Sequence, residues 1–274
     1  MDRQDSPSVQ GLTVPQAIAN LTQTEDTSSR YYAAWWLGHF RVGQRSAVEA
    51  LLAALEDSSD RTPNGGYPLR RNAARALGKL GDRAAVMPLI ESLRCEDYYV
   101  RESAAQSLEE LGDVRAVAPL AELLQGGDSD ITLVPNTPHL KQPYNAVLEA
   151  LGQLKAVEQA EAIKRFLTHP TPRIQYAAAR ALYQLTQEPQ YGDRLVAALQ
   201  SPELQLRRSA LLDLGAIGYL AAADAIAATP AENSLKLIAL KGLLEHQLNA
   251  DAFGGAGQTS AAAKKVMTLM DRLL

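Results

Sequence analysis

Tyrosine, arginine and glutamate residues stand at one variable place in a repeated stretch of this 274-residue sequence. The stretches RRNAARALGKLGD from Arg70 and RESAAQSLEELGD from Arg101 share most of their letters, but the two residues after the first arginine differ. The equivalent pairs are Tyr31-Tyr32, Arg71-Asn72, Glu102-Ser103, Asn145-Ala146, Tyr176-Ala177 and Arg208-Ser209. Each pair is expected in the first turn of a helix, where free backbone N–H groups and the helix dipole favour anions. Stacked in register, these side chains would line one groove and bind a ligand there, or they would form an ordinary solvated surface.

The shared letters of the repeat predict the helices that position these residues. They follow the pattern R-x-x-A-A-x-x-L-x-x-L-G-D, whose apolar positions i, i+1, i+4 and i+7 form one stripe of an α-helix. The Gly-Asp pair supplies a helix-ending glycine and an N-cap for a second amphipathic helix. Variants of the pattern begin at Arg30, Tyr144, Gln175 and Arg207. We therefore predict an all-α fold, an α-solenoid (superhelix) of about six HEAT-like helix pairs.

The spacing of the copies and the composition of the ends predict how the chain is organised. A flexible N-terminus is expected over residues 1–13, and a single HEAT-like repeat solenoid over 14–248. The stretch NADAFGGAGQTSAAA predicts a flexible linker over 249–263, followed by a C-terminal amphipathic helix over 264–274.

Charge and cysteine content narrow the class of protein. A net charge of −4 argues against nucleic acid or an anionic membrane as the main partner. No apolar run approaches the roughly 18–20 residues of a membrane helix, so we expect no membrane insertion. The single cysteine, Cys95, excludes an internal disulfide and suits a reducing compartment. These features predict a cytoplasmic protein.

Two sets of residues have alternative interpretations. The recurrent arginines Arg30, Arg70, Arg101 and Arg207 either bridge to an acidic residue of the adjacent repeat or bind an anion. In the first copy, Trp35 and Trp36 stand where other copies carry Arg75 and Ala76. Tyr31 with Trp35, and Tyr32 with Trp36, are expected as i,i+4 pairs on adjacent faces. The preceding segment VPQAIANL either covers these aromatic residues or leaves them as a surface for a ligand or partner.

Familiar catalytic motifs are missing from the sequence. The four histidines are scattered without an HExxH pattern, and there is no CxxC pair, so no metal is predicted. Cys95 ends a helix next to Glu96 and Asp97, a setting that disfavours a reactive thiolate. We interpret this cysteine as unreactive.

The stretches RYYAAWWLG, GGYPLRRNAARALGKLGD and CEDYYVRESAAQSLEELGD resemble the E subunit of the E/F-type phycocyanobilin lyases of cyanobacteria. The resemblance extends over nearly all of residues 14–244. It implies a heterodimer with an F-type HEAT subunit that attaches phycocyanobilin, an open-chain tetrapyrrole, to a cysteine of the apo-phycocyanin α subunit through a thioether. The bilin is then a bound substrate, and no prosthetic group is expected.

The chemistry implied by the resemblance suits the variable residues. A bilin needs aromatic faces, arginines for its propionates and a carboxylate for its pyrrole N–H groups. We assign Glu102 as the candidate catalytic residue. The residues expected to bind the bilin or the partner are Tyr31, Tyr32, Trp35, Trp36, Arg70, Arg71, Tyr98, Tyr99, Arg101, Tyr176, Arg207 and Arg208. The alternative is a non-catalytic HEAT-repeat adaptor or chaperone in phycobilisome assembly or degradation.

Overall fold

The computed structural model describes residues 12–126, 134–135, 137–253 and 259–274 of the chain. These residues form helices and turns, with no β-strand among them. The chain divides into two compact units, Met1–Pro119 and Leu120–Leu274. Each unit is an array of paired helices, which confirms the predicted all-α solenoid.

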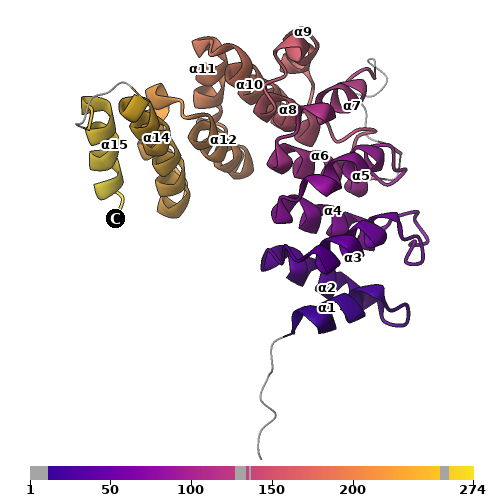
Figure 1. The fold of residues 1–274 in the computed structure, drawn as a ribbon. Coiled ribbons are helices and arrows are strands. Elements are labelled where there is room, and N and C mark those ends of the chain that lie inside the picture. The colour runs from indigo at the N-terminus through magenta and orange to yellow at the C-terminus, as the bar shows by residue number, and fades with distance from the viewer. Residues whose placement is uncertain (1–11, 127–133, 136, 254–258) are drawn as a thin grey trace, which may run out of the picture. The chain divides into compact units, whose positions relative to one another are not determined.

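The helices of the first unit lie in two layers (Figure 1). Helices α2, α4 and α6, which carry the repeated motif, stack on one another, and α3 and α5 form the other layer. The elements, with η for a 3₁₀ helix, are α1 (Val14–Thr22), α2 (Thr27–His39), α3 (Arg45–Glu56), α4 (Pro68–Leu80), η1 (Arg83–Ala85), α5 (Val86–Ser92), α6 (Tyr98–Leu111) and η2 (Val114–Ala116). Helix α7 (Val117–Glu122) crosses the division between the units.

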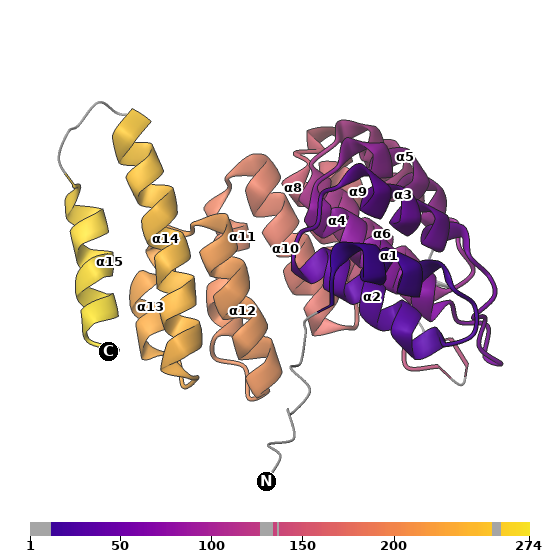
Figure 2. The same ribbon diagram turned by 60° about the horizontal axis from the view of Figure 1, so that its bottom comes forward.

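The second unit continues the pairing. Its elements are α8 (Tyr144–Gln153), η4 (Val157–Gln159), α9 (Ala160–Lys164), η5 (Arg165–Thr168), α10 (Pro172–Thr186), α11 (Pro189–Ala198), α12 (Leu204–Ile217), η6 (Leu220–Ala222), α13 (Ala223–Ala228), α14 (Asn233–Phe253) and α15 (Ala261–Asp271). The motif helices α8, α10, α12 and α14 pack in that order. Helix α15 lies beside α14 (Figure 2).

Small residues let the motif helices approach one another closely. Ala73 and Ala74 are fully buried on α4. A Cβ atom added to Gly78 would lie 2.6 Å from the Cβ atom of Ser107 on α6, so only glycine fits there. The Ser107 hydroxyl donates a hydrogen bond of 2.8 Å to the carbonyl of Ala74. The two helices are thereby held in one register.

The Gly-Asp pairs end one helix and start the next, as the sequence predicts. Gly81 has φ 73° and Gly112 has φ 66°, left-handed conformations that glycine adopts without steric cost. Asp82 accepts a hydrogen bond of 2.8 Å from the backbone N–H of Ala84, which caps the 3₁₀ turn of η1. Each of these two repeats therefore contains the residues that end its first helix and begin the next one.

The chain ends differ in detail from the expected boundaries. Helix α14 continues to Phe253, beyond the expected end of the solenoid at residue 248. The amide of Gln247 donates to Asp251 one turn later at 2.8 Å, and Asp251 also accepts from the backbone N–H of Ser260 at 3.1 Å. These bonds extend the helix into the stretch predicted as a linker. Most of the predicted N-terminal segment and residues 254–258 lie outside the described residues, and the domain boundaries stay a prediction.

Candidate functional site

The recurrent arginine of the first repeat is a structural residue. Arg30 is 3% exposed, and its guanidinium lies 2.6 Å from the Asp57 carboxylate. It also donates to the carbonyl of Leu21 at 3.0 Å. Burial would raise the pKa of Asp57, but hydrogen bonds from Arg30 and Ser59 outweigh it and lower the pKa to about 2. The bridge to an acidic residue is the contact that the sequence predicts.

The other three recurrent arginines bind carbonyl oxygens at the end of the preceding helix or in the turn that follows it. Arg70 donates to the carbonyl of Asp57 at 2.7 Å, and Arg101 to that of Cys95 at 2.6 Å. Arg207 donates to the carbonyl of Ser201 at 2.7 Å. Helix C-terminal carbonyls lack intrahelical partners and favour cations. These contacts with backbone carbonyls favour a structural role for all three arginines.

An exposed aromatic stack runs along α2. The rings of Tyr32 and Trp35 stack with centroids 5.6 Å apart, and those of Trp35 and His39 with centroids 4.6 Å apart. Tyr32 is 52% exposed and Trp35 46% exposed, although α1 packs against α2. The segment before α2 therefore does not cover this stack. We call Tyr32, Trp35 and His39 the aromatic stack.

The ring pairs of α2 differ from the expected ones. Trp36 is half-buried and contacts Phe40 at 5.0 Å, not Tyr32. Phe40 in turn meets His39 edge-on at 4.8 Å. Tyr31 makes none of the ring contacts found among the described residues of α2, and its hydroxyl donates to Asp60 at 3.0 Å.

Asp60 explains why Tyr31 turns away from the stack. Its Oδ2 atom also accepts from the backbone N–H of Leu69 at 2.8 Å, at the start of α4. Burial and the neighbouring Asp60 carboxylate raise the pKa of Tyr31. The first insertion between repeats is thus bonded to both α2 and α4.

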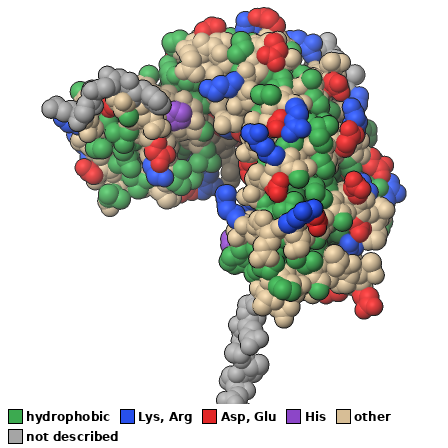
Figure 3. Space-filling view, in the orientation of Figure 1, with side chains coloured by type: hydrophobic (Ala, Val, Ile, Leu, Met, Phe, Trp, Pro, Cys, Tyr) green, Lys and Arg blue, Asp and Glu red, His purple; other side chains and the backbone are tan. Residues whose placement is uncertain are grey.

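A basic and aromatic cluster lies on α4 and α6. The Arg71 guanidinium lies over the Tyr99 ring, 5.1 Å from its centroid, and Tyr98 meets Tyr99 edge-on at 5.3 Å. Arg75 follows one helical turn after Arg71, and both are half-buried. Burial lowers the pKa of Arg75, Arg71 lowers it further, and Glu102 opposes both. On the face of the first unit seen in Figure 3, basic and hydrophobic side chains lie next to one another.

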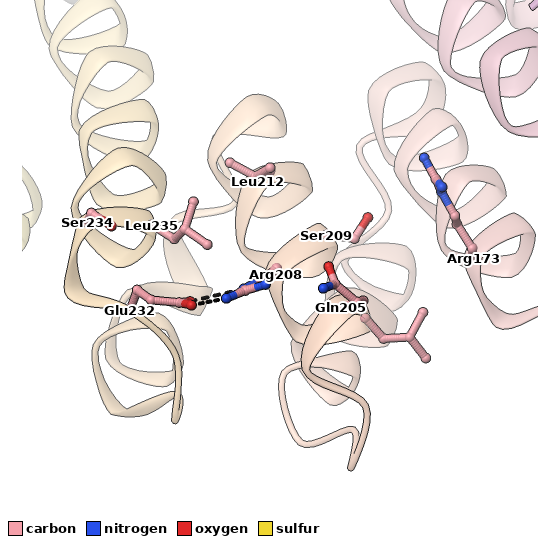
Figure 4. A pocket seen from close by; sticks show the side chains of 9 residues that line it. Arg173, Gln205, Arg208, Ser209, Leu212, Glu232, Ser234 and Leu235 are labelled. Carbon is pink, nitrogen blue, oxygen red and sulfur yellow. Dashed lines mark hydrogen bonds and ion pairs between the residues drawn. The ribbon is translucent and has the colours of Figure 1, made fainter.

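The second unit contains the remaining predicted residues. Arg208 pairs with Glu232, and this pair borders a cavity of about 610 Å³ (Figure 4). The cavity is lined by residues of α10, α12 and α14 and the turn before α14: Arg173, Gln205, Leu206, Arg208, Ser209, Leu212, Glu232, Ser234 and Leu235. The hydrogen bonds from Arg208 lower the pKa of Glu232 to about 2. Tyr176 is half-buried on α10.

Three residues of the first unit were not among the predicted site residues. His39 and Phe40 extend the aromatic surface, and their spacing of four from Trp35 and Trp36 is a signal in the sequence. Arg75 is the third, and its spacing of four from Arg71 places both on one face of the helix.

The described residues include neither a metal site nor a membrane-spanning helix. Among the described residues, no group of three or more histidine, cysteine, aspartate or glutamate side chains is placed to hold a metal ion. None of the helices in that part of the chain has the length and apolarity to cross a membrane.

Two known families match parts of the sequence and indicate the class of protein. The family described as HEAT repeats matches residues 66–133 and 143–215. The family described as PBS lyase HEAT-like repeat matches residues 29–57, which contain the aromatic stack. Paired helices and motif matches together define a HEAT-repeat protein.

Individual relatives narrow this class. A phycocyanobilin lyase subunit alpha from Synechocystis sp. is 60% identical over 262 residues, 96% of either chain. The bilin biosynthesis protein PecE of Mastigocladus laminosus is 45% identical over 243 residues, 88% of this chain and 85% of that protein. A chain in the solved complex of CpcE and CpcF of phycocyanin lyase from Nostoc sp. PCC7120 is 58% identical, with a TM-score of 0.88 and complete coverage of both chains. This chain belongs to the family of phycocyanobilin lyase alpha subunits.

Proposed function

We infer that this chain is the E-type subunit of a heterodimeric bilin lyase, which attaches phycocyanobilin to phycocyanin together with an F-type subunit. The observation that carries this inference is the identity of about 60% over 96% of the chain with phycocyanobilin lyase alpha subunits. The solved CpcE–CpcF complex, whose matching chain has the same fold, supports a two-subunit enzyme. The acceptor we propose is a cysteine of the phycocyanin α subunit.

The first unit supplies the side chains that such a substrate requires. A bilin is a flexible conjugated molecule with pyrrole N–H donors and two carboxylates. The aromatic stack of Tyr32, Trp35 and His39 offers exposed ring faces for it. We propose that the pigment binds on this unit, and that the structural arginines Arg70 and Arg101 hold the helices and not the pigment.

The proposed reaction is an addition. The acceptor sulfur forms a C–S bond to the ethylidene carbon of ring A, the C=C π bond breaks, and the thiol proton ends on the pigment, so nothing is oxidised or reduced. The acceptor protein supplies the nucleophile. Positioning of two reactants can supply roughly 7–11 kcal/mol of such a barrier, so this chain needs no nucleophilic residue.

Glu102 is our proposed polarising residue. It is half-buried on α6 and makes no hydrogen bond or ion pair with another described side chain, so its oxygens remain able to accept pyrrole N–H groups. Glu102→Gln should lower the rate of attachment at least about tenfold, as loss of a proton-transfer or polarising group does. The matched control is Glu110→Gln, an exposed glutamate two turns later on α6. An unchanged rate for Glu102→Gln would remove this residue from the mechanism.

The function is tested by co-expression of this chain with an F-type subunit, the apo-phycocyanin α subunit and a source of phycocyanobilin. Bilin fluorescence on a denaturing gel reports covalent adduct, and we expect it only when this chain is present. Equal attachment without the chain would refute the lyase and return the adaptor as the better explanation. The cytoplasmic location expected from the sequence stays a prediction.

A further inference from the structure

Two arginines on α4 lack an anionic partner that matches their charge. Neither the Arg71 nor the Arg75 side chain makes a hydrogen bond or an ion pair within the described residues. The Nε atom of Arg71 is buried without a hydrogen-bond acceptor. A buried donor without a partner carries a free-energy penalty that a bound acceptor removes. Arg71 and Arg75 therefore have N–H donors without acceptors, and both side chains are half-buried.

The surroundings of the pair hold it in position but do not neutralise it. Arg71 is fixed over the Tyr99 ring at 5.1 Å. Burial and the positive charge of Arg71 lower the pKa of Arg75, and the negative charge of Glu102 opposes this change. Two guanidinium groups facing one carboxylate leave an excess of one positive charge. Arginine binds carboxylates in a forked, two-bond geometry, which makes a carboxylate a fitting ligand here.

The neighbouring helix adds an aromatic surface next to the pair. Trp35 stands on α2 at the motif position that Arg75 occupies on α4, and these two helices pack against each other. The close packing is evident at Gly38, where an added Cβ would lie 2.7 Å from the Cα atom of Ala76. Packed helices lie about 8–10 Å apart, so a planar ligand lying on the aromatic stack can place a side-chain carboxylate at the arginine pair.

We propose that Arg71 and Arg75 bind a propionate carboxylate of the pigment, while its ring plane lies against Tyr32, Trp35 and His39. This inference rests on the proposed function and deepens it, because it assigns the orientation of the pigment. Glu102, on the neighbouring helix α6, then lies near the bound propionate. The arginine pair acts in binding and orientation, and it takes no part in bond formation.

The test compares two probes, phycocyanobilin and its dimethyl ester, on the complete complex of this chain, its F-type partner and the apo-phycocyanin α subunit. The ester keeps the conjugated system but removes both negative charges. We expect the wild-type complex to use the free acid with a KM at least about tenfold lower than that of the ester, since charge-assisted hydrogen bonds of this kind typically contribute that much. In Arg75→Gln, and more so in Arg71→Gln/Arg75→Gln, this preference should fall to near unity. The control Arg83→Gln removes an exposed arginine of η1 and should keep it.

The outcomes separate this inference from the function on which it rests. A wild-type complex that forms no adduct with either probe refutes the lyase, and the inference with it. Adduct formation with equal KM for acid and ester refutes the arginine subsite alone, and this measurement needs no variant to fold. If both variants still prefer the acid, the carboxylate of the pigment binds elsewhere. This outcome also refutes the site at Arg71 and Arg75. Equal losses for acid and ester would show that the arginines act only in packing.

Discussion

Asp213 is a carboxyl group buried in the second unit between charges of both signs. It lies on α12, and its Oδ1 atom is 3.3 Å from the Arg180 guanidinium on α10. The same guanidinium lies 3.9 Å from Glu149 on α8. Burial raises the pKa of Asp213 to about 7; Arg180 opposes the rise, and Glu149 adds to it. Arg180 thus lies near carboxylates from both neighbouring repeats, and the charge of Arg173 also opposes the rise in the pKa of Asp213.

The raised pKa of Asp213 predicts how stability depends on pH. Between about pH 4 and 7 the folded state holds a proton that the unfolded state has lost, so the free energy of unfolding falls as pH rises through this range. Above about pH 7 both states are ionised and the loss is complete. Asp213→Asn mimics the protonated side chain, so its unfolding free energy should fall less than that of the wild type between pH 5 and pH 8. Denaturant titrations at the two pH values measure the difference.

A matched control uses a carboxylate outside the core. Asp271→Asn changes an exposed aspartate at the end of α15 and should leave the pH dependence of the wild type unaltered. Parallel pH profiles for Asp213→Asn and the wild type would contradict the assignment of a raised pKa to Asp213.

The types of the site residues could be predicted from the sequence, but not all of their contacts. Trp35 stands out because equivalent positions in other repeats are polar, and it is exposed as the ligand or partner alternative requires. Tyr31 looks equally suited in the sequence, yet its hydroxyl bonds to Asp60 from an insertion 29 residues away. Such a contact depends on the path of a non-repeating loop, which periodicity does not determine. Comparing repeats shows which residues differ, while the direction of a side chain is set by its tertiary neighbours.

At the scale of elements, the register of the motif helices depends on glycine at their contacts. Gly78→Ala would place a Cβ atom 2.5–2.8 Å from atoms of Ser107, including the backbone Cα, so α4 and α6 must move apart. Overpacking of this kind typically costs about 1–3 kcal/mol of unfolding free energy. The change should lower the midpoint of chemical unfolding, measured by far-UV circular dichroism.

Gly43→Ala is the matched control for that substitution. An added Cβ at Gly43 meets no atom within 4 Å, and the residue is exposed in the turn before α3. Its effect on the midpoint should be near zero or slightly stabilising, because alanine restricts the unfolded chain. Equal destabilisation by both variants would mean that helix contacts do not determine the effect at Gly78.

The motif helices and their turns follow from the sequence because each repeat contains its own signals. Alanine pairs, the leucine stripe and the Gly-Asp turn are all local, and Gly81 and Gly112 end their helices as predicted. Elements without a repeated signal were less predictable. The end of α14 is one case, since Gln247 and Asp251 stabilise a helical turn in a sequence typical of a linker. The short 3₁₀ turns, such as η1, are another.

At the scale of the whole molecule, the proposed function requires surfaces for both a pigment and a partner subunit. Exposed aromatic side chains serve either purpose, so the sequence leaves the role of the aromatic stack open. The neighbouring Arg71 and Arg75 favour the pigment, because their excess of positive charge matches a carboxylate-bearing ligand. The stack and the arginine pair belong to one compact unit, so both can contact the same molecule.

This assignment predicts that pigment binding can be lost while the heterodimer is kept. Tyr32→Ala/Trp35→Ala removes two stacked rings that are about half exposed, so the fold should be retained. Aromatic contacts of about 0.5–1.5 kcal/mol each predict a decrease in bilin affinity of about tenfold or more. Co-purification with a tagged F-type subunit should be unchanged, while the yield of fluorescent adduct falls. The control Ile238→Ala removes an exposed apolar side chain of α14, and it should alter neither. Loss of co-purification in the double variant, with adduct yield falling in proportion, would instead assign the aromatic stack to the partner subunit.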